Sequence, residues 1–311
     1  MAVHQVETNI HQTVKVSVKQ KKKKKFNYVP YVFLLPAIVL LLVFEYVPTL
    51  NAFYYSFTEY HILSPAEWTG LQNYKMMMDD EKFWIALGNS MKYFVITVPM
   101  LVILPLFLAI LVNRSIKGIT LFRVIYYLPV VTAMVAVAIV WKYLYHPTGL
   151  INAALHGIGW DHADINWLLN KNTALPAVSM LEAWKAAGFY MLIYLAGLQT
   201  VSKDLIEAAR IDGASRIRIL WHVYLPQLRP VFAVTVVMAT LGTVQMFTSI
   251  YVMTGGGPLD STMSLPLYIY QKAFVEFDMG YATAMGMVLW LILMVLTIIN
   301  YKLSRGGQSI Q

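Results

Sequence analysis

Residues 207–214 read Glu207-Ala208-Ala209-Arg210-Ile211-Asp212-Gly213-Ala214, and residues 223–226 read Val223-Tyr224-Leu225-Pro226. Both stretches lie in a polar, charged insert over residues 200–230 that separates two long apolar runs. A long apolar run can cross a bilayer as a helix, whereas a cluster of charges is costly in its hydrocarbon core. The sequence therefore predicts a membrane protein in which this insert is a loop outside the bilayer.

The composition favours the same class. The chain has 311 residues, of which 58% are hydrophobic and 13% are charged, and its mean hydropathy is +0.58. Soluble domains carry about 25% charged residues and a smaller apolar share. Because several apolar runs reach the roughly 20 residues that a helical span needs, we predict an all-α integral membrane protein.

Six apolar stretches are long enough to be transmembrane helices. The first is too long for a signal-peptide core and lacks a small-residue cleavage site, so we expect it to stay uncleaved. The expected spans cover about residues 29–55, 86–112, 121–143, 174–198, 229–253 and 281–303. The predicted organisation is a basic tail at 1–28, a transmembrane domain at 29–303 with the loop 200–230, and a C-terminal tail at 304–311.

The charge distribution predicts the orientation. If the N-terminus is cytoplasmic, the inner segments hold seventeen of the 24 Lys and Arg residues but only four of the 16 Asp and Glu residues. By the positive-inside rule, both termini and the loop 200–230 are then cytoplasmic. The run Lys21 to Lys25 directly precedes the first span, so attraction to anionic lipid, about 1 kcal/mol per residue, explains it better than binding to nucleic acid.

The residue types in the loop suit a docking surface. Ala208 and Ala209 favour helix and have small side chains, so a partner can approach closely. Gly213 permits a positive φ and Asp212 is a turn former, which together predict a sharp turn between two short helices. Glu207 is an exposed charge available to a basic partner.

The second half of the loop has its own signals. Ser215 can cap a helix that runs through Ile217, Leu220 and Trp221, and Pro226 fits a bend before the fifth span because it lacks a backbone donor. An amphipathic helix resting on lipid headgroups is the alternative interpretation. That alternative does not explain the spacing of the Glu-Ala-Ala, Gly and Leu-Pro segments.

This spacing resembles the cytoplasmic loop shared by the permease subunits of ABC importers. Other segments are similar to the carbohydrate-uptake branch of that family, the maltose-type permeases. They are Trp68–Tyr74, Gly118–Arg123, Tyr127–Pro129, Gly149–Asn152, Trp184-Lys185, Leu195–Gln199 and Tyr251–Pro258. One departure is that the branch often has Phe-Asp before its Tyr-Val-x-Thr segment, whereas Phe247 is followed by Thr248 here.

The resemblance implies the type I importer permease fold and a role in sugar uptake across the bacterial inner membrane. It implies a second permease subunit, two ATPase subunits and an external sugar-binding protein as partners. In the family, the loop docks into an ATPase subunit and transmits its closure to the permease pair. The residues expected to couple in this way are Glu207, Ala208, Ala209, Asp212, Gly213, Ala214, Leu225 and Pro226.

Enzymatic functions are disfavoured. The sequence has no Gly-x-x-x-x-Gly-Lys-Ser/Thr phosphate loop, no Ser/His/Asp arrangement, no metal-ligand spacing and no cysteine. We therefore expect no catalytic residue, metal or cofactor in this chain, with ATP and Mg²⁺ bound by the partner ATPases. The alternatives are a permease for another solute, such as a glycerol phosphate or a peptide, and an ion-coupled secondary transporter, which would need intramembrane acidic residues and inverted repeats.

Polar residues inside the spans are candidates for the solute path. Gln245, Thr248 and Ser249 share one face of the fifth span, at i, i+3 and i+4 spacing, and Tyr190 and Tyr194 lie one turn apart on the fourth. Aromatic rings suit the C–H faces of sugars, and amides and hydroxyls suit their hydroxyl groups. We predict that these five residues line the path, with hydrogen bonding between helices as the alternative.

Two charged residues and two prolines have simpler explanations. Glu182 and Lys185, three residues apart at the outer start of the fourth span, are expected to form an ion pair with each other. Pro99 and Pro105 fall inside the second span, where a membrane helix tolerates them as a kink or a hinge.

Overall fold

A computed structural model describes most of the chain, over residues 29–113, 117–160 and 165–305. The predicted basic tail at 1–28 and the last residues of the predicted C-terminal tail, 306–311, lie outside the described residues. The described part is mainly helical, and its two named strands are two residues long each. The all-α class is therefore confirmed.

The chain forms two compact units, and the first, residues 1–50, holds most of the first predicted span. Helix α2 covers Val29–Leu41, π-helix η1 covers Leu42–Tyr46, and α3 (Val47–Tyr55) crosses the unit boundary. All described side chains of this unit are exposed. An exposed surface that is apolar apart from a few residues such as Glu45 suits lipid or another membrane subunit.

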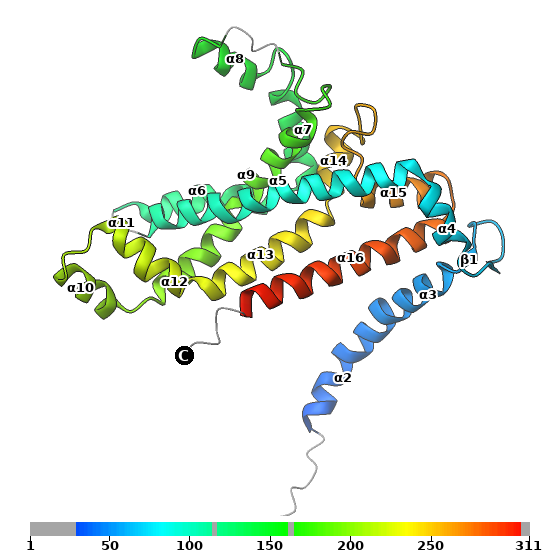
Figure 1. Ribbon diagram of the computed structural model, residues 1–311, viewed down its shortest axis with the longest axis horizontal. Helices are drawn as coiled ribbons and strands as arrows, with labels where there is room; N and C mark the ends of the chain where they lie inside the picture. The colour runs from blue at the N-terminus through cyan, green and yellow to red at the C-terminus, as the bar shows by residue number, and fades with distance from the viewer. Residues whose placement is uncertain (1–28, 114–116, 161–164, 306–311) are drawn as a thin grey trace, which may run out of the picture. The chain divides into compact units, whose positions relative to one another are not determined.

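The second unit, residues 51–311, is built around five long helices. They are α5 (Glu81–Val112), α6 (Ile119–Val131), α9 (Ala174–Gln199), α13 (Arg229–Val244) and α16 (Met279–Arg305). Helix α5 packs against α9 and α13, α9 packs also against α6, and α13 packs also against α16 (Figure 1). Helix α5 stays continuous through Pro99 and Pro105.

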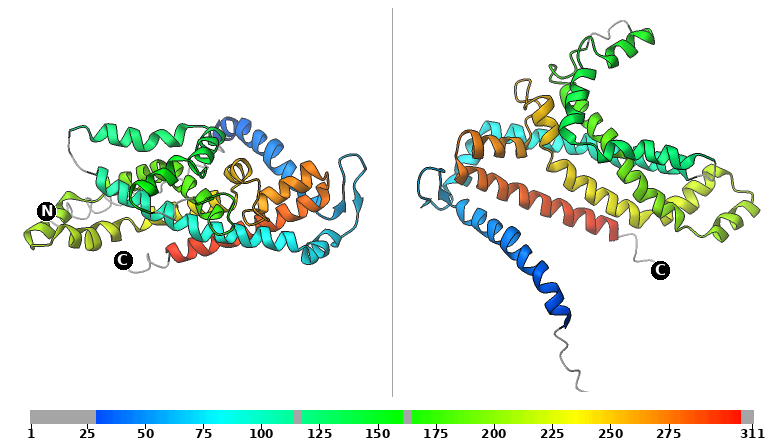
Figure 2. Two further views of the ribbon diagram at one scale, coloured as in Figure 1. Left: turned by 90° about the horizontal axis from the view of Figure 1, so that it is seen from above. Right: turned by 180° about the vertical axis from the view of Figure 1, so that it is seen from behind.

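Short elements occupy the two ends of this unit. One end, called here the loop end, holds α10 (Lys203–Ile211), α11 (Arg216–Ile219), π-helix η2 (Leu220–Tyr224) and α12 (Leu225–Gln227). The strand end holds α4 (Gln72–Asp79) and the antiparallel strands β1 (Thr58–Glu59) and β2 (Glu67–Trp68), with Thr58 opposite Trp68. The three ribbon views agree that these two ends lie at opposite ends of the long helices (Figures 1 and 2).

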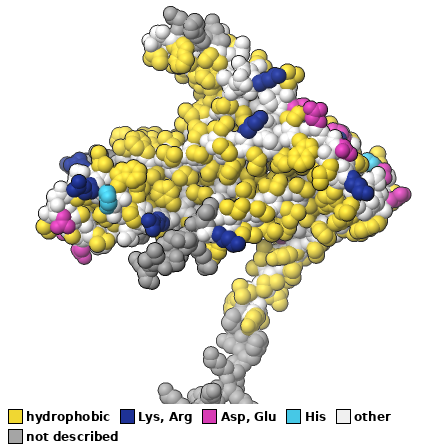
Figure 3. Space-filling view, in the orientation of Figure 1, with side chains coloured by type: hydrophobic (Ala, Val, Ile, Leu, Met, Phe, Trp, Pro, Cys, Tyr) yellow, Lys and Arg dark blue, Asp and Glu magenta, His cyan; other side chains and the backbone are white. Residues whose placement is uncertain are grey.

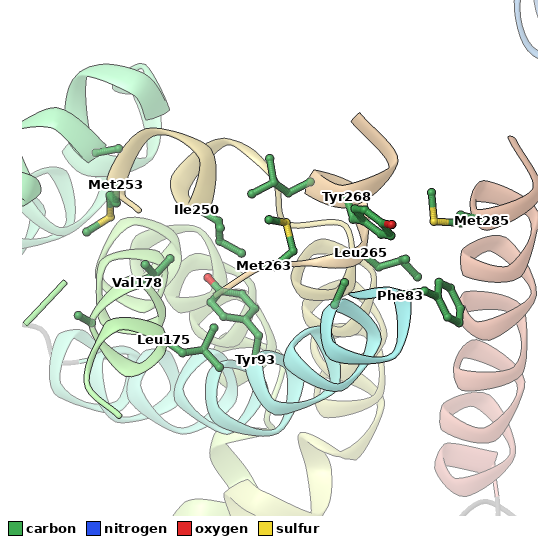
Figure 4. Close-up of a cluster of buried hydrophobic side chains, with 14 of the residues drawn as sticks. Phe83, Tyr93, Leu175, Val178, Ile250, Met253, Met263, Leu265, Tyr268 and Met285 are labelled. Atoms are coloured by element: carbon green, nitrogen blue, oxygen red, sulfur yellow. The ribbon is translucent and has the colours of Figure 1, made fainter. Parts of the chain in front are cut away.

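The main hydrophobic core lies between the middle of this unit and its strand end. It joins long helices to α7 (Met134–Leu144), α8 (Leu150–Gly157), α14 (Thr248–Met253) and α15 (Leu265–Tyr270). The π-helix η3 (Gln271–Val275) follows α15. Figure 4 shows Tyr93 of α5 beside Leu175 and Val178 of α9, with Ile250 of α14 and Leu265 of α15 in the same cluster. This core holds α14, the segment that follows the break described below.

The structure contains three to five candidate membrane spans among the described residues. Three helices are long and apolar enough by themselves, Tyr31–Tyr55, Glu81–Val112 and Met279–Lys302. Two bent pairs can each form one more, Ile119–Val131 with Met134–Leu144, bent by 100°, and Arg216–Gln227 with Arg229–Val244, bent by 68°. Six spans with cytoplasmic termini stay a prediction.

The fifth predicted span is not one helix. Helix α13 ends at Val244, residues 245–247 are not helical, and α14 begins at Thr248. The helix ends after a glycine and two β-branched residues, Gly242 to Val244, which favour helix poorly. The hydroxyl of Ser264 donates to the carbonyl of Met246 at 3.1 Å and so satisfies a backbone group at the break.

The surface of the second unit fits a membrane environment. On the face drawn in Figure 3, hydrophobic side chains cover the long helices, and most charged side chains lie toward the two ends. Val95 and Ile103 of α5 are each 65% exposed, and Trp290 of α16 is 51% exposed. Large apolar side chains exposed along whole helices are expected where lipid or another membrane subunit covers them.

Candidate functional site

The loop at residues 200–230 has the local structure that its sequence predicts. Gly213 has a φ of +75°, in the left-handed region that favours glycine, and it separates helices α10 and α11. The Ser215 hydroxyl accepts a hydrogen bond from the Arg218 N–H at 3.3 Å, which confirms the predicted helix cap. Ser202 caps α10 in the same way by accepting from the Asp204 N–H. The sharp turn between two short helices is therefore confirmed.

The expected coupling residues differ in exposure. Five are exposed and three are partly buried: Glu207, Ala208, Asp212, Gly213 and Pro226 in the first group, and Ala209, Ala214 and Leu225 in the second. Three large apolar side chains of the same loop are also exposed: Ile211 is 86%, Ile217 is 71% and Trp221 is 63% exposed. Apolar side chains of this size at the loop end form a surface suited to a protein partner.

A separate hydrophobic cluster links the loop to the long helices. Leu228, directly after α12, is fully buried against Tyr194 and Leu198 of α9 and Val112 of α5. Tyr224 of the loop packs against the same cluster. Because a close-packed core transmits displacement, a movement of the loop would be carried into α5 and α9 through these contacts.

A cavity of about 410 Å³ lies where α13 breaks off before α14. Its lining comes from α6, α7, α9 and the broken segment, and consists of Val130, Met134, Glu182, Lys185, Ala186, Phe189, Tyr190, Gly242, Gln245, Met246, Phe247 and Thr248. The break is what opens residues 245–248 to this space, because their backbone no longer follows the helix.

The structure brings together three of the five residues predicted for the solute path. Tyr190, Gln245 and Thr248 line the cavity. Tyr194 and Ser249 do not line it and are fully buried. The expectation that Gln245, Thr248 and Ser249 share one face of a continuous helix is wrong, because the helix is interrupted between them.

The predicted ion pair between Glu182 and Lys185 is also wrong. Both side chains line the cavity, but Lys185 Nζ donates to the carbonyl of Val130 on α6 at 3.3 Å. Glu182 is 8% exposed, and its Oε1 is buried without a hydrogen bond from any described residue. The bend after α6 offers Lys185 a backbone partner that the sequence does not reveal.

Buried hydroxyl groups continue from Glu182 into the helix bundle. Ser249 of α14 and Tyr93 of α5 lie beside Glu182, and the hydroxyl oxygens of both are buried without a hydrogen-bond partner among the described residues. Farther into the bundle, the hydroxyls of Tyr194 on α9 and Thr235 on α13 are also buried, close to each other. Unsatisfied polar groups inside a membrane bundle are costly and are typical of a solute or water path.

Two aromatic residues of the cavity, Phe189 and Phe247, were not predicted from the sequence. Phe189 lies one turn after Lys185 on α9, and Phe247 stands in the break, stacked on Tyr251 at a centroid distance of 5.3 Å. Phe189 follows the polar residues Glu182 and Lys185 at helical spacing on α9, and this spacing is a signal that could have identified it. Phe247 could not be assigned, because the weak helix formers at 242–244 do not by themselves show that the helix breaks there.

A second polar cluster lies at the strand end. Asp80 caps α5 by accepting from the N–H groups of Lys82 and Phe83, and its Oδ2 accepts from the hydroxyls of Tyr268 and Tyr281 at 2.6 and 2.7 Å. Burial alone would raise the pKa of Asp80, but these hydrogen bonds together lower it below the usual value. Burial and the bond to Asp80 raise the pKa of Tyr268. The cluster joins α5, α15 and α16 and has a structural role.

Metal binding has no candidate site in the part of the chain that the structure describes. No group of three or more His, Asp or Glu side chains is placed there to hold a metal ion. The expectation that ATP and Mg²⁺ bind to partner subunits stays a prediction.

Comparison with known proteins gives a consistent set of similarities. Residues 86–306 match the family described as "Binding-protein-dependent transport system inner membrane component". A probable ABC transporter permease protein of Bacillus subtilis, YesP, is 37% identical, with 92% of this chain and 93% of the relative covered. The multiple sugar-binding transport system permease protein MsmF of Streptococcus mutans is 32% identical, with 90% and 96% covered.

A solved structure has the same fold. It is a bacterial ABC transporter involved in the import of the acidic polysaccharide alginate, and one of its chains superposes with a TM-score of 0.79. The match covers 91% of this chain and 96% of that chain, at 24% sequence identity. This similarity confirms the type I importer permease fold, while the number of spans and their orientation stay predictions.

Proposed function

We propose, because this chain belongs to the family of binding-protein-dependent transport system inner membrane components, that it is a permease subunit of an ATP-driven importer that carries a sugar into the bacterial cytoplasm. The kinship with ABC importer permeases that the Glu-Ala-Ala loop predicts is thereby confirmed. The family match at 86–306 includes both the loop and the cavity.

The cavity at the α13–α14 break is the observation that carries the sugar assignment. Phe189 and Tyr190 supply aromatic surface, and Gln245 and Thr248 supply an amide and a hydroxyl. Its volume of about 410 Å³ lies within the range of ligand-binding pockets, roughly 300–1,000 Å³. The sugar-binding system named for the relative MsmF supports the same substrate class.

The loop at 200–230 couples this permease to an ATPase subunit in our proposal. Its exposed side chains, Ile211, Ile217 and Trp221, provide the apolar contact, and Glu207 provides a charge at the rim. The cluster around Leu228 then carries a displacement of the loop into α5 and α9, which borders the cavity. ATP is bound and hydrolysed by the partner, and this chain has no catalytic role.

The full importer has, in addition, a second permease, a second ATPase and an extracytoplasmic sugar-binding protein. The exposed apolar surfaces of α2, α5 and α16 are available for the second permease and for lipid. With the loop in the cytoplasm, the strand end of the second unit faces outward, toward the binding protein.

The direct test is transport by the reconstituted system. The chain is co-expressed with the second permease and the ATPase, the complex is placed in proteoliposomes with its binding protein, and uptake of labelled neutral mono- and disaccharides is followed with and without ATP. ATP-dependent accumulation of at least one sugar is expected. ATP-dependent uptake of an amino acid or a phosphate ester, with no sugar transported, would contradict the proposal.

A further inference from the structure

Glu182 is an unusual component of the cavity. It is a carboxylate within a membrane bundle, 8% exposed, and no described residue donates a hydrogen bond to its buried Oε1. An isolated charge at such a depth is costly and marks a functional position by default. Its position in the cavity lining places the carboxylate next to the space available to a solute.

The cationic residue of the cavity attracts this carboxylate but does not pair with it. Lys185 donates to the carbonyl of Val130 instead of to Glu182. It is also more exposed than Glu182, so water screens its charge more strongly than that of the buried carboxylate. Lys185 therefore supplies no hydrogen bond to the buried Oε1 of Glu182, which stays available to a solute.

The neighbouring hydroxyls leave the buried Oε1 of Glu182 without a hydrogen-bond donor among the described residues. Ser249 and Tyr93 lie beside it, yet the hydroxyl oxygen of each is buried without a hydrogen bond to any described residue. An ionised carboxylate offers about four acceptor positions and no donor. A solute that presents hydroxyl groups can fill these positions with charge-assisted hydrogen bonds.

We infer that Glu182 is a specificity-determining residue that makes this permease select neutral saccharides and disfavour acidic ones. The hydroxyls of a neutral sugar donate to the carboxylate, whereas the carboxylate of a uronic acid would place a second negative charge beside it. This inference rests on the proposed function and names its substrate class more closely. The solved importer of the acidic polysaccharide alginate has the same fold, so the fold alone does not decide the charge of the cargo.

The experiment measures binding of paired saccharides to the assembled importer without its binding protein, so that delivery does not decide the result. The probes are tritiated lactose, maltose and cellobiose and the three corresponding acids in which the terminal CH₂OH is oxidised to a carboxylate. Wild-type importer is expected to bind at least one neutral disaccharide roughly tenfold more tightly than its acid. Glu182→Gln should reduce this ratio to about threefold or less, whereas Glu182→Asp, which keeps the charge, should preserve it.

Glu276→Gln is the matched control, because Glu276 is exposed, is paired with Lys272 and does not line the cavity. It should bind all probes as the wild type does. A wild-type importer without preference for the neutral sugars, or a Glu182→Gln importer with an unchanged ratio, would overturn the inference and leave sugar import intact. If none of these saccharides binds to the wild type, the inference is overturned, whereas the sugar assignment is decided separately by the uptake experiment above.

Discussion

The hydroxyl of Tyr268 lies 2.6 Å from Oδ2 of Asp80, although the two residues are 188 positions apart in the chain. The bond joins the start of α5 to α15. Lys82 and Lys272 lie over the ring of Tyr268 at 5.3 and 5.7 Å from its centroid. At the strand end, a charge-assisted hydrogen bond thus joins two residues that are far apart in the sequence.

Tyr268→Phe removes this bond and leaves the ring in place. A hydrogen bond to a charged group contributes about 1.5–3 kcal/mol, so the variant should lose stability of this order. Thermal unfolding of the purified importer checks the expectation by a lower midpoint. Tyr143→Phe is the control, because Tyr143 is 74% exposed and its loss should leave the midpoint unchanged. Equal midpoints for the Tyr268 variant and the control would show that the bond contributes nothing.

The lowered pKa of Asp80 predicts a pH dependence of stability. Because the folded pKa lies below the unfolded value of about 3.9, the contribution of Asp80 is fully present above about pH 4 and is lost as the pH falls through the folded pKa. Asp80→Asn removes this contribution and should flatten the acid branch of the midpoint-against-pH curve. An acid branch of the same steepness in both proteins would argue against the assignment.

Gly188 marks a close approach of α9 to α6. A Cβ at this position would meet the backbone carbonyl of Tyr126, which cannot move aside as a side chain can. Gly188→Ala should therefore force α6 away from α9 and lower the yield of assembled importer, with a loss of about 1–3 kcal/mol. Gly286→Ala on α16 is the matched control, since a Cβ there meets nothing within 4 Å. Normal yield and stability for Gly188→Ala would contradict the packing described.

The cavity residues should control solute handling without affecting assembly. Tyr190→Phe and Gln245→Ala each remove one polar group from the lining, which should weaken uptake of the preferred sugar about 3- to 10-fold. Uptake kinetics in proteoliposomes measure the effect, and co-purification of the partner subunits reports assembly. If neither variant alters the kinetics for any transported sugar, the cavity is not the solute path.

A structural feature can be predicted from the sequence when neighbouring residues alone determine it. The turn at Gly213 and the cap at Ser215 are predictable because one residue supplies the conformation or the acceptor that its neighbours need. The break before Thr248 is not predictable from the sequence, because the apolar run continues through it. The carbonyl of Met246 that the break frees is satisfied by Ser264, eighteen residues later in the chain.

The charged residues of the cavity illustrate the same limit. Spacing on one helix suggested a pair between Glu182 and Lys185, but Lys185 finds the Val130 carbonyl, 55 positions away, at the bend after α6. Contacts of this kind depend on how separate helices meet, and sequence periodicity carries no information about them. Tyr190 and Gln245 line one cavity because the break after α13 opens residues 245–248 to it, and their place in a solute path stays a prediction.

Coupling through the loop at Gly213 is the central claim, and the ratio of sugar transported to ATP hydrolysed tests it most directly. Gly213→Leu and Gly159→Leu each place a side chain at a positive φ, +75° and +84° respectively, and a Cβ at either position meets no atom within 4 Å. Both variants therefore carry a similar backbone strain of about 1–2 kcal/mol. Only Gly213 lies in the loop. The account predicts that Gly213→Leu lowers the ratio at least about fivefold while the chain still inserts, and that Gly159→Leu leaves it unchanged. A normal ratio for Gly213→Leu would contradict the account.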